Sequence, residues 1–240
     1  GFLSGGFDSS SVIASAKKYK DIECFTIRPE GGTDNDTTND LPYAEYVAKY
    51  LNVNLNIIDI NSHNIREDIE KMIWHLDEPL ADPAALNVYY IAKAAKKMGI
   101  KVLLSGTGGD DIFTGYRRHI AANYENFFSL FPMKLSTALE KIGNKLDKRN
   151  SYGRRISKLF ENLSLRGNYK LISYFKWANT DEIFELFNSE VQDIIRTEIP
   201  ERPMIDYLNN YDASTSSINK MLLLEQRFFL ADHNLLYTDK

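Results

Sequence analysis

The sequence predicts an α/β fold, a parallel doubly wound sheet followed by an all-helical C-terminal part. Short apolar runs alternate with amphipathic helical segments from the N-terminus to about residue 115. Beyond that point the pattern is aromatic-rich and helical, without strand-like runs. Such alternation places helices on both faces of a parallel sheet. We therefore expect an α/β domain over residues 1–120 and a helical extension packed on it over residues 121–240.

The strand-like segments are short and largely apolar. The first is Gly1-Phe2-Leu3, and the others are expected at residues 22–27, 53–60 and 100–104. The first and the last of these run directly into glycine-rich turns. Because ligands of parallel sheets bind at the carboxyl ends of the strands, we expect both turns to lie at one sheet edge.

The spacing of apolar residues predicts helices at residues 8–19, 41–51, 63–75, 84–98, 120–131 and 218–229. We expect Ser62 to cap the third helix and Gly99 to end the fourth. Polar or proline-containing loops are expected at residues 29–40 and 76–83, and a break at residues 231–234.

Composition excludes several classes of protein. Hydrophobic residues make up 43% and charged residues 26% of the chain, as in globular proteins. The net charge of −4 argues against a dedicated nucleic-acid binder. Residues 134–170 carry a basic excess, for which solvated helical faces are favoured over an RNA-binding arm. The single cysteine, Cys24, excludes an internal disulfide, and no apolar run approaches the ~20 residues of a membrane span. We expect a cytoplasmic protein, and the abrupt chain ends indicate a fragment of a longer one.

The stretch Ser4-Gly5-Gly6-Phe7-Asp8-Ser9 joins the first strand to the first helix. Glycines permit a sharp turn, and the amide groups of a helix N-terminus favour an anion. Asp8 would repel a polyphosphate by about 4 kcal/mol per charge pair at an effective dielectric of 20, so a bridging Mg²⁺ is expected. The alternative is a purely structural turn in which Asp and Ser cap the helix.

This stretch resembles the PP-loop, Ser-Gly-Gly-x-Asp-Ser, of ATP pyrophosphatases. The resemblance implies an adenine-nucleotide α-hydrolase-like fold, binding of ATP and cleavage between its α and β phosphates. The carboxyl or carbonyl group of a substrate would become an adenylate.

A second glycine-rich stretch, residues 103–119, resembles the Ser-Gly-x-Gly-x-Asp-Glu-x-Phe-x-Gly-Tyr segment of glutamine-dependent asparagine synthetases. Residues 74–79 with Asp82-Pro83, and residues 235–240, resemble further segments of that family. The resemblance covers most of the chain except residues 123–219.

The resemblance implies roles for particular residues. The two aspartates associated with Mg²⁺ and pyrophosphate would be Asp8 and Asp110, and Thr107 would occupy a catalytic position beside them. The residues around ATP would be Leu3, Ser4, Gly5, Gly6, Asp8, Ser9, Ile27, Ser105 and Gly106.

The implied reaction is ATP-dependent adenylation of a small-molecule carboxylate, with aspartate as the leading acceptor. Ammonia released from glutamine would then give asparagine, AMP and pyrophosphate. The family's glutaminase domain is absent from this sequence, so ammonia would come from a missing part or a separate subunit. The family's later catalytic lysine also lies beyond these residues. The sequence leaves open whether the protein forms a homodimer.

Thr107 departs from the family, which usually carries Glu or Asp at this position. Threonine is no base at neutral pH without an activating partner. Another carboxylate such as a sugar uronate or a cell-envelope precursor would then be the acceptor, Asp111 would take over, or the protein would be impaired. Two further alternatives are a tRNA-modifying PP-loop ATPase and a degenerate nucleotide-binding module.

Overall fold

The computed structural model describes residues 1–29, 40–76, 78, 80, 82–125, 127, 130–147, 150–176, 183–196 and 200–238. The chain groups into two compact units. Unit 1 comprises Gly1–Phe113 and Phe229–Lys240, and unit 2 comprises Thr114–Phe228. The C-terminal residues thus group with the first part of the chain. The division at residue 120 into an α/β domain and a helical domain stays a prediction.

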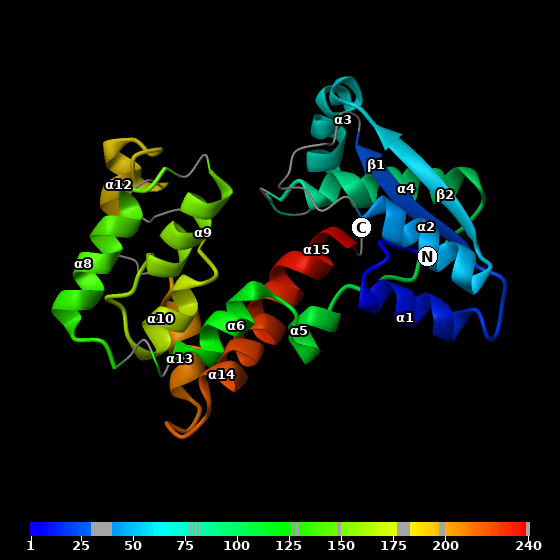
Figure 1. Cartoon of the computed structure of the whole chain (residues 1–240). Helices are drawn as coiled ribbons and strands as arrows, with labels where there is room; N and C mark the ends of the chain where they lie inside the picture. Colours follow the sequence, from blue (N-terminus) through cyan, green and yellow to red (C-terminus); the bar gives the residue numbers. More distant parts are fainter. Residues whose placement is uncertain are drawn as a thin grey trace. The chain divides into compact units, whose positions relative to one another are not determined.

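Unit 1 contains a small parallel sheet (Figure 1). Strand β1, Glu23–Pro29, pairs with β2, Asn54–Ile60, so that Glu23 lies opposite Asn54. Phe2 forms a parallel bridge with Phe25 on the other side of β1. The Phe2 amide points away from β1 and donates to the carbonyl of Leu104 at 2.8 Å. The segments therefore lie in the order Leu104, Phe2, β1, β2.

The expected strand at residues 100–104 is not formed. Residues 101–106 belong to no regular element, and Val102 is 76% exposed. Phe2, in the neighbouring segment, donates one backbone hydrogen bond to the carbonyl of Leu104. A single backbone hydrogen bond does not make a β-ladder. Ile100 and Leu103 nevertheless pack against the core beside β1.

Helices cover both faces of this sheet. Cys24 and Phe25 are neighbours on β1, and their side chains point to opposite faces. On the Cys24 side, α1 (Phe7–Ala16) and α2 (Leu41–Leu51) complete a core with Leu3. On the Phe25 side, α4 (Ala84–Lys97) contributes Ile91 and Ala95. Helix α3 (Ser62–His75) packs beside α4 through Met72.

Some helix boundaries agree with the local sequence signals and others do not. Helix α2 has the bounds that the sequence predicts, and Gly99 follows α4 at φ +75°. The predicted cap of α3 was wrong. Asn61 takes that place, and its side chain accepts from the Asn64 amide at 2.8 Å. The expected loops at residues 30–39, and the motif residues Asp77 and Pro79, lie outside the described residues, as do Asp239 and Lys240.

The regular elements among the described residues of unit 2 are all helices. The helices are α6 (Arg117–Asn123), α8 (Met133–Asn144), α9 (Ser151–Phe160), α10 (Gly167–Ser173), α12 (Ser189–Arg196), α13 (Arg202–Asn209) and α14 (Ser217–Leu224). Helix α10 supplies Leu171 to one buried cluster with Met221 and Ile172 to another with Leu208. The apolar faces of these helices are thus buried against one another in two clusters, without a sheet among the described residues of this unit.

The C-terminal segment stays helical where the sequence predicts a break. After α14 the chain continues as a π-helix, η1 (Glu225–Asn234), and then as α15 (Leu235–Thr238). The predicted break at residues 231–234 was therefore wrong. The polar side chains His233 and Asn234 have partners inside unit 1, so they do not end the helix. In the described part of the chain, no helix is both long and apolar enough to cross a membrane.

Candidate functional site

The first glycine-rich turn is held together by its serines. Ser4 Oγ and Ser9 Oγ lie 3.0 Å apart, and Ser4 Oγ accepts from the Gly6 amide at 3.2 Å. Gly5 has φ +80°, and a Cβ there would lie 2.5 Å from the backbone of Ala44. Among the described residues, no side chain caps the start of α1. The turn therefore delivers the uncapped N-terminus of a ten-residue helix, which favours anions.

The second glycine-rich turn lies against the first. A Cβ on Gly106 would lie 2.5 Å from Ser9 N and 2.9 Å from Asp8 C, so the two backbones touch. A Cβ on Gly109 would meet the Asp8 carboxylate, with Oδ1 at 2.6 Å. Gly109 begins the short helix α5 (Gly109–Phe113), in which Asp110 is the next residue. The structure thus brings together the two turns that the sequence singles out.

Thr107 lies at the exposed tip of the second turn. Its Oγ1 is 2.7 Å from Ser105 Oγ, and its amide donates to the same oxygen at 3.0 Å. The hydroxyl is thus engaged within its own turn. Asp111, the suggested substitute base, is fully buried and accepts from Asn234 Nδ2 at 3.2 Å. A buried carboxylate with this partner is poorly placed to meet a substrate.

The other two predicted contacts of ATP lie on opposite faces of the sheet. Leu3 is 1% exposed and packs with Ile13 on the α1 side. Ile27 packs with the clusters on the α4 side. The side chain of Leu3 fills the core, so this residue offers a ligand only its backbone.

A cavity of about 370 Å³ lies elsewhere in unit 1. It runs along one face of α4 and is lined by Met72, His75, Leu76, Ala85, Val88, Tyr89, Ala92, Lys93, Lys96 and Tyr237. None of the predicted site residues lines it. Burial, followed by the charges of Asp82 and Asp111, raises the pKa of Tyr237 to about 12. Tyr237 therefore keeps its hydroxyl proton at neutral pH.

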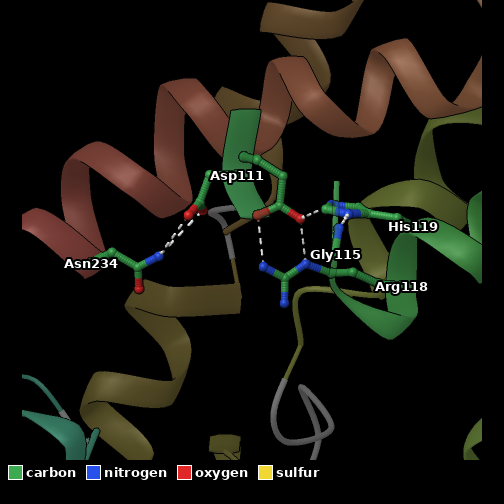
Figure 2. A network of polar contacts seen from close by, with 6 residues as sticks. Asp111, Gly115, Arg118, His119 and Asn234 are labelled. Atoms are coloured by element: carbon green, nitrogen blue, oxygen red, sulfur yellow. Dashed lines mark hydrogen bonds and ion pairs between the residues drawn. The ribbon is translucent and has the colours of Figure 1, made fainter. Parts of the chain in front are cut away.

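Unit 2 holds a buried polar cluster around Glu225, which is 0% exposed. Figure 2 labels two members of this cluster, Arg118 and His119. The Arg118 guanidinium pairs with both carboxylate oxygens, with Nη2 to Oε2 at 2.7 Å. His119 Nδ1 accepts from the Gly115 amide at 3.0 Å, so Nε2 carries the proton that faces Glu225 at 3.0 Å. The side chain of Arg118 is 17% exposed. The structure gives it a partly buried structural role.

Sequence reasoning missed the partners that the C-terminal helix brings to unit 1. Asn234 bonds Asp111, and His233 pairs with Asp82 at 3.3 Å. A usable signal existed, because Phe229, His233 and Tyr237 recur every four residues, which is a helical spacing. That spacing contradicts a break at this point.

Comparison with known proteins gives one family. The family model described as asparagine synthase matches residues 1–240. An asparagine synthetase (glutamine-hydrolyzing) of Bacillus subtilis is 30% identical over 100% of this chain and 36% of its own length. A putative asparagine synthetase of Methanocaldococcus jannaschii is 32% identical over 60% of this chain and 27% of its own length.

A protein with a different name also matches. The amidase chyE of Penicillium rubens is 28% identical over 48% of this chain and 19% of its own length. The chain thus spans about a third of the length of the Bacillus relative and less of the others.

Proposed function

Because this chain belongs to the asparagine synthase family, we propose that it is the ATP-using part of an amide-forming ligase. A substrate carboxylate attacks the α-phosphorus of ATP, which forms an acyl-adenylate and releases pyrophosphate. Ammonia then attacks the acyl carbon, which forms the amide and releases AMP. The observation that carries the proposal is the contact between the two glycine-rich turns, Gly106 against Ser9 and Gly109 against Asp8.

The first turn is the proposed pyrophosphate cradle. Its glycines keep side chains away from the approach path, and the start of α1 directs backbone amides toward the anion. Ser4 and Ser9 add hydroxyl groups. Together with the order of segments in the sheet, this supports a PP-loop fold of the doubly wound type. The turn acts by positioning ATP and by stabilising charge on the leaving pyrophosphate.

Asp8 and Asp110 are the proposed holders of Mg²⁺. Carboxylate oxygens are the hard ligands that this ion prefers. The Asp8 carboxylate lies beside Gly109, and Asp110 is the next residue in the chain. Asp8 lies in the first turn of α1, and Asp110 lies in α5 next to Gly109, where an added Cβ would meet the Asp8 carboxylate. When bound, the ion would neutralise the charge of the leaving pyrophosphate.

The acceptor is proposed to be aspartate, since the relatives that match most of this chain are named asparagine synthetases. Thr107 keeps a second class of acceptor open, a different carboxylate such as a sugar uronate or a cell-envelope precursor. Its exposed, uncharged hydroxyl would shape the entrance to the site differently from a carboxylate. One matching protein is named an amidase, so the relatives of this chain are not all named for asparagine.

Ammonia is proposed to come from glutamine, hydrolysed by a domain or subunit outside these residues. The Bacillus relative is named as glutamine-hydrolysing, and this chain spans 36% of it.

The proposal is tested by ATP–pyrophosphate exchange with a panel of carboxylic acids. We expect exchange with one acid class, and a loss of about 100-fold in Asp8→Asn, comparable to removing a charge-stabilising group from other active sites. Asp21→Asn, at an exposed aspartate outside both turns, is the matched control and should keep full activity. If Thr107→Glu creates aspartate-dependent exchange that the native chain lacks, aspartate is not the native acceptor.

Two other outcomes would overturn the proposal. Exchange that requires tRNA, and weakens steeply with salt, would indicate a tRNA-modifying enzyme. Binding of Mg·ATP without exchange for any acid, and unchanged in Asp8→Asn, would indicate a degenerate nucleotide-binding module.

A further inference from the structure

The C-terminal helix of unit 1 reaches the second glycine-rich turn at two points. Asn234 Nδ2 lies 3.2 Å from both oxygens of Asp111, 123 residues away in sequence (Figure 2). Asp111 is 0% and Asn234 is 6% exposed. One helical turn before Asn234, the side chain of Leu230 lies beside Gly108. A Cβ placed on Gly108 would be 3.4 Å from Leu230 Cδ1. The turn is therefore packed against η1 by both a polar and an apolar contact.

The orientation of the Asn234 amide follows from its partner. Asn234 Nδ2 donates to both oxygens of Asp111, so the NH₂ group of Asn234 faces Asp111. Its carbonyl oxygen then faces His233, whose Nδ1 lies 3.0 Å away. His233 Nδ1–H is the donor of that bond.

His233 extends the chain of contacts to a third segment. Its Nε2 lies 3.3 Å from Asp82 Oδ2, and Asp82 Oδ1 accepts from the Ala84 amide at the start of α4. The ring stacks on Phe229 at 4.6 Å and meets Tyr237 edge-on at 5.8 Å. The ring therefore has contacts on its faces and at both nitrogens, and it donates to Asn234 and to Asp82 together only as the imidazolium, with both nitrogens protonated.

We propose that Asp82, His233 and Asn234 form a positioning relay for the second glycine-rich turn. Helix α5 has five residues, which is too short to be stable by itself. The relay anchors it through Asp111, and so fixes Asp110 beside Asp8. His233 and Asn234 are positioning residues, and the catalytic consequence of the relay rests on the proposed function.

The test exchanges the two polar groups. Asn234→Asp places a carboxylate against Asp111, so amide hydrogen exchange across residues 104–113 should rise at least 10-fold. The double variant Asp111→Asn/Asn234→Asp restores a donor and an acceptor, and Asp at position 234 still accepts from His233. Exchange in this double variant should return to within about threefold of the native rate.

The matched control is Leu51→Ala, which weakens the core on the α2 side without touching the relay. It should not raise exchange selectively at residues 104–113. Amide hydrogen exchange that is unchanged in Asn234→Asp would overturn the relay. So would a double variant whose amide hydrogens exchange as fast as those of Asn234→Asp, or which unfolds as readily.

A kinetic arm separates the relay from the proposed function. In ATP–pyrophosphate exchange, Asn234→Asp should lower kcat by at least 10-fold, and the double variant should recover most of it. A double variant that regains native hydrogen exchange but no turnover would contradict a purely positioning role. If the native chain shows no ATP–pyrophosphate exchange with any acid, the proposed function fails. The amide hydrogen exchange rates then still decide whether the relay exists.

Discussion

Gly106 has no room for a side chain, because the backbone of the first turn occupies the space beside its Cα. Gly99 differs, since nothing lies within 4 Å of a Cβ placed there, although its φ is +75°. One glycine is needed for close approach and the other for backbone conformation. The two glycines therefore allow contact between the turns to be tested separately from backbone strain.

Gly106→Ala should destabilise the chain by about 1–3 kcal/mol, since its Cβ meets backbone atoms that cannot rotate away. It should also abolish Mg·ATP binding, because the turns are pushed apart. Gly99→Ala should cost about 1 kcal/mol through strain alone and keep that binding. Urea unfolding and calorimetric titration measure the two effects. Native Mg·ATP affinity in Gly106→Ala would refute the role of the contact.

Glu125 provides a pH-dependent test in unit 2. Burial raises its pKa above the ordinary 4.5, and the attraction of Lys170 only partly opposes this. The folded state thus keeps the proton to higher pH than the unfolded state. Its contribution to stability is complete below pH 4.5 and is lost as the pH rises through the folded pKa.

Glu125→Gln should therefore gain stability relative to the native chain as the pH rises from 4 to 7, because glutamine cannot ionise. Urea unfolding at several pH values measures the difference between the two. Glu185→Gln, at an exposed glutamate, is the control and should show little pH dependence. A difference for Glu125→Gln that stays constant with pH would contradict the buried acid.

At the scale of elements, α6 and the first residues of η1 are joined by the buried cluster around Glu225 (Figure 2). A carboxylate at 0% exposure needs compensating donors, and Arg118 and His119 supply them. By contrast, the Arg28–Asp59 pair on β1 and β2 is 52% and 66% exposed. Water competes for that pair, so it contributes much less.

Arg118→Ala should lower the free energy of unfolding by about 3–5 kcal/mol, because it leaves a buried charge without its main partner. Arg28→Ala removes the same side chain from an exposed pair and should have a far smaller effect. Chemical denaturation of both variants measures the contrast. Equal losses would mean that Glu225 is not dependent on Arg118.

For the whole molecule, the single cysteine limits the chemistry of this chain. Cys24 lies on β1 at 0% exposure, and burial raises the pKa of its thiol. A buried, protonated thiol is a poor nucleophile. These 240 residues therefore contain no cysteine suited to hydrolysing glutamine.

Amide formation by this chain should accordingly proceed with ammonium chloride and not with glutamine. Cys24→Ser should leave the ammonium-dependent rate of correctly folded protein unchanged. AMP release with each nitrogen donor measures this. Turnover with glutamine equal to that with ammonium would show a glutaminase centre that lies within these residues.

Local features of the fold were predictable to the extent that they depend on neighbouring residues. Helix α2 has its predicted bounds, and the two glycine-rich turns lie against each other, as their expected place at one sheet edge predicts. The strand expected at residues 100–104 failed because a ladder depends on a distant partner, and Phe2 supplies one bond. The break expected at residues 231–234 failed because its polar residues are paired inside the fold.

The sequence by itself determined the two glycine-rich turns, the amphipathic helices and the resemblance to a family, because backbone conformation and motif spacing are local properties. Only the tertiary structure decided which partner each carboxylate meets. It brought Asp8 against Gly109, Asp111 to Asn234 and Glu225 to Arg118. These contacts join segments up to 123 residues apart, and burial makes each carboxylate depend on the partner that folding supplies.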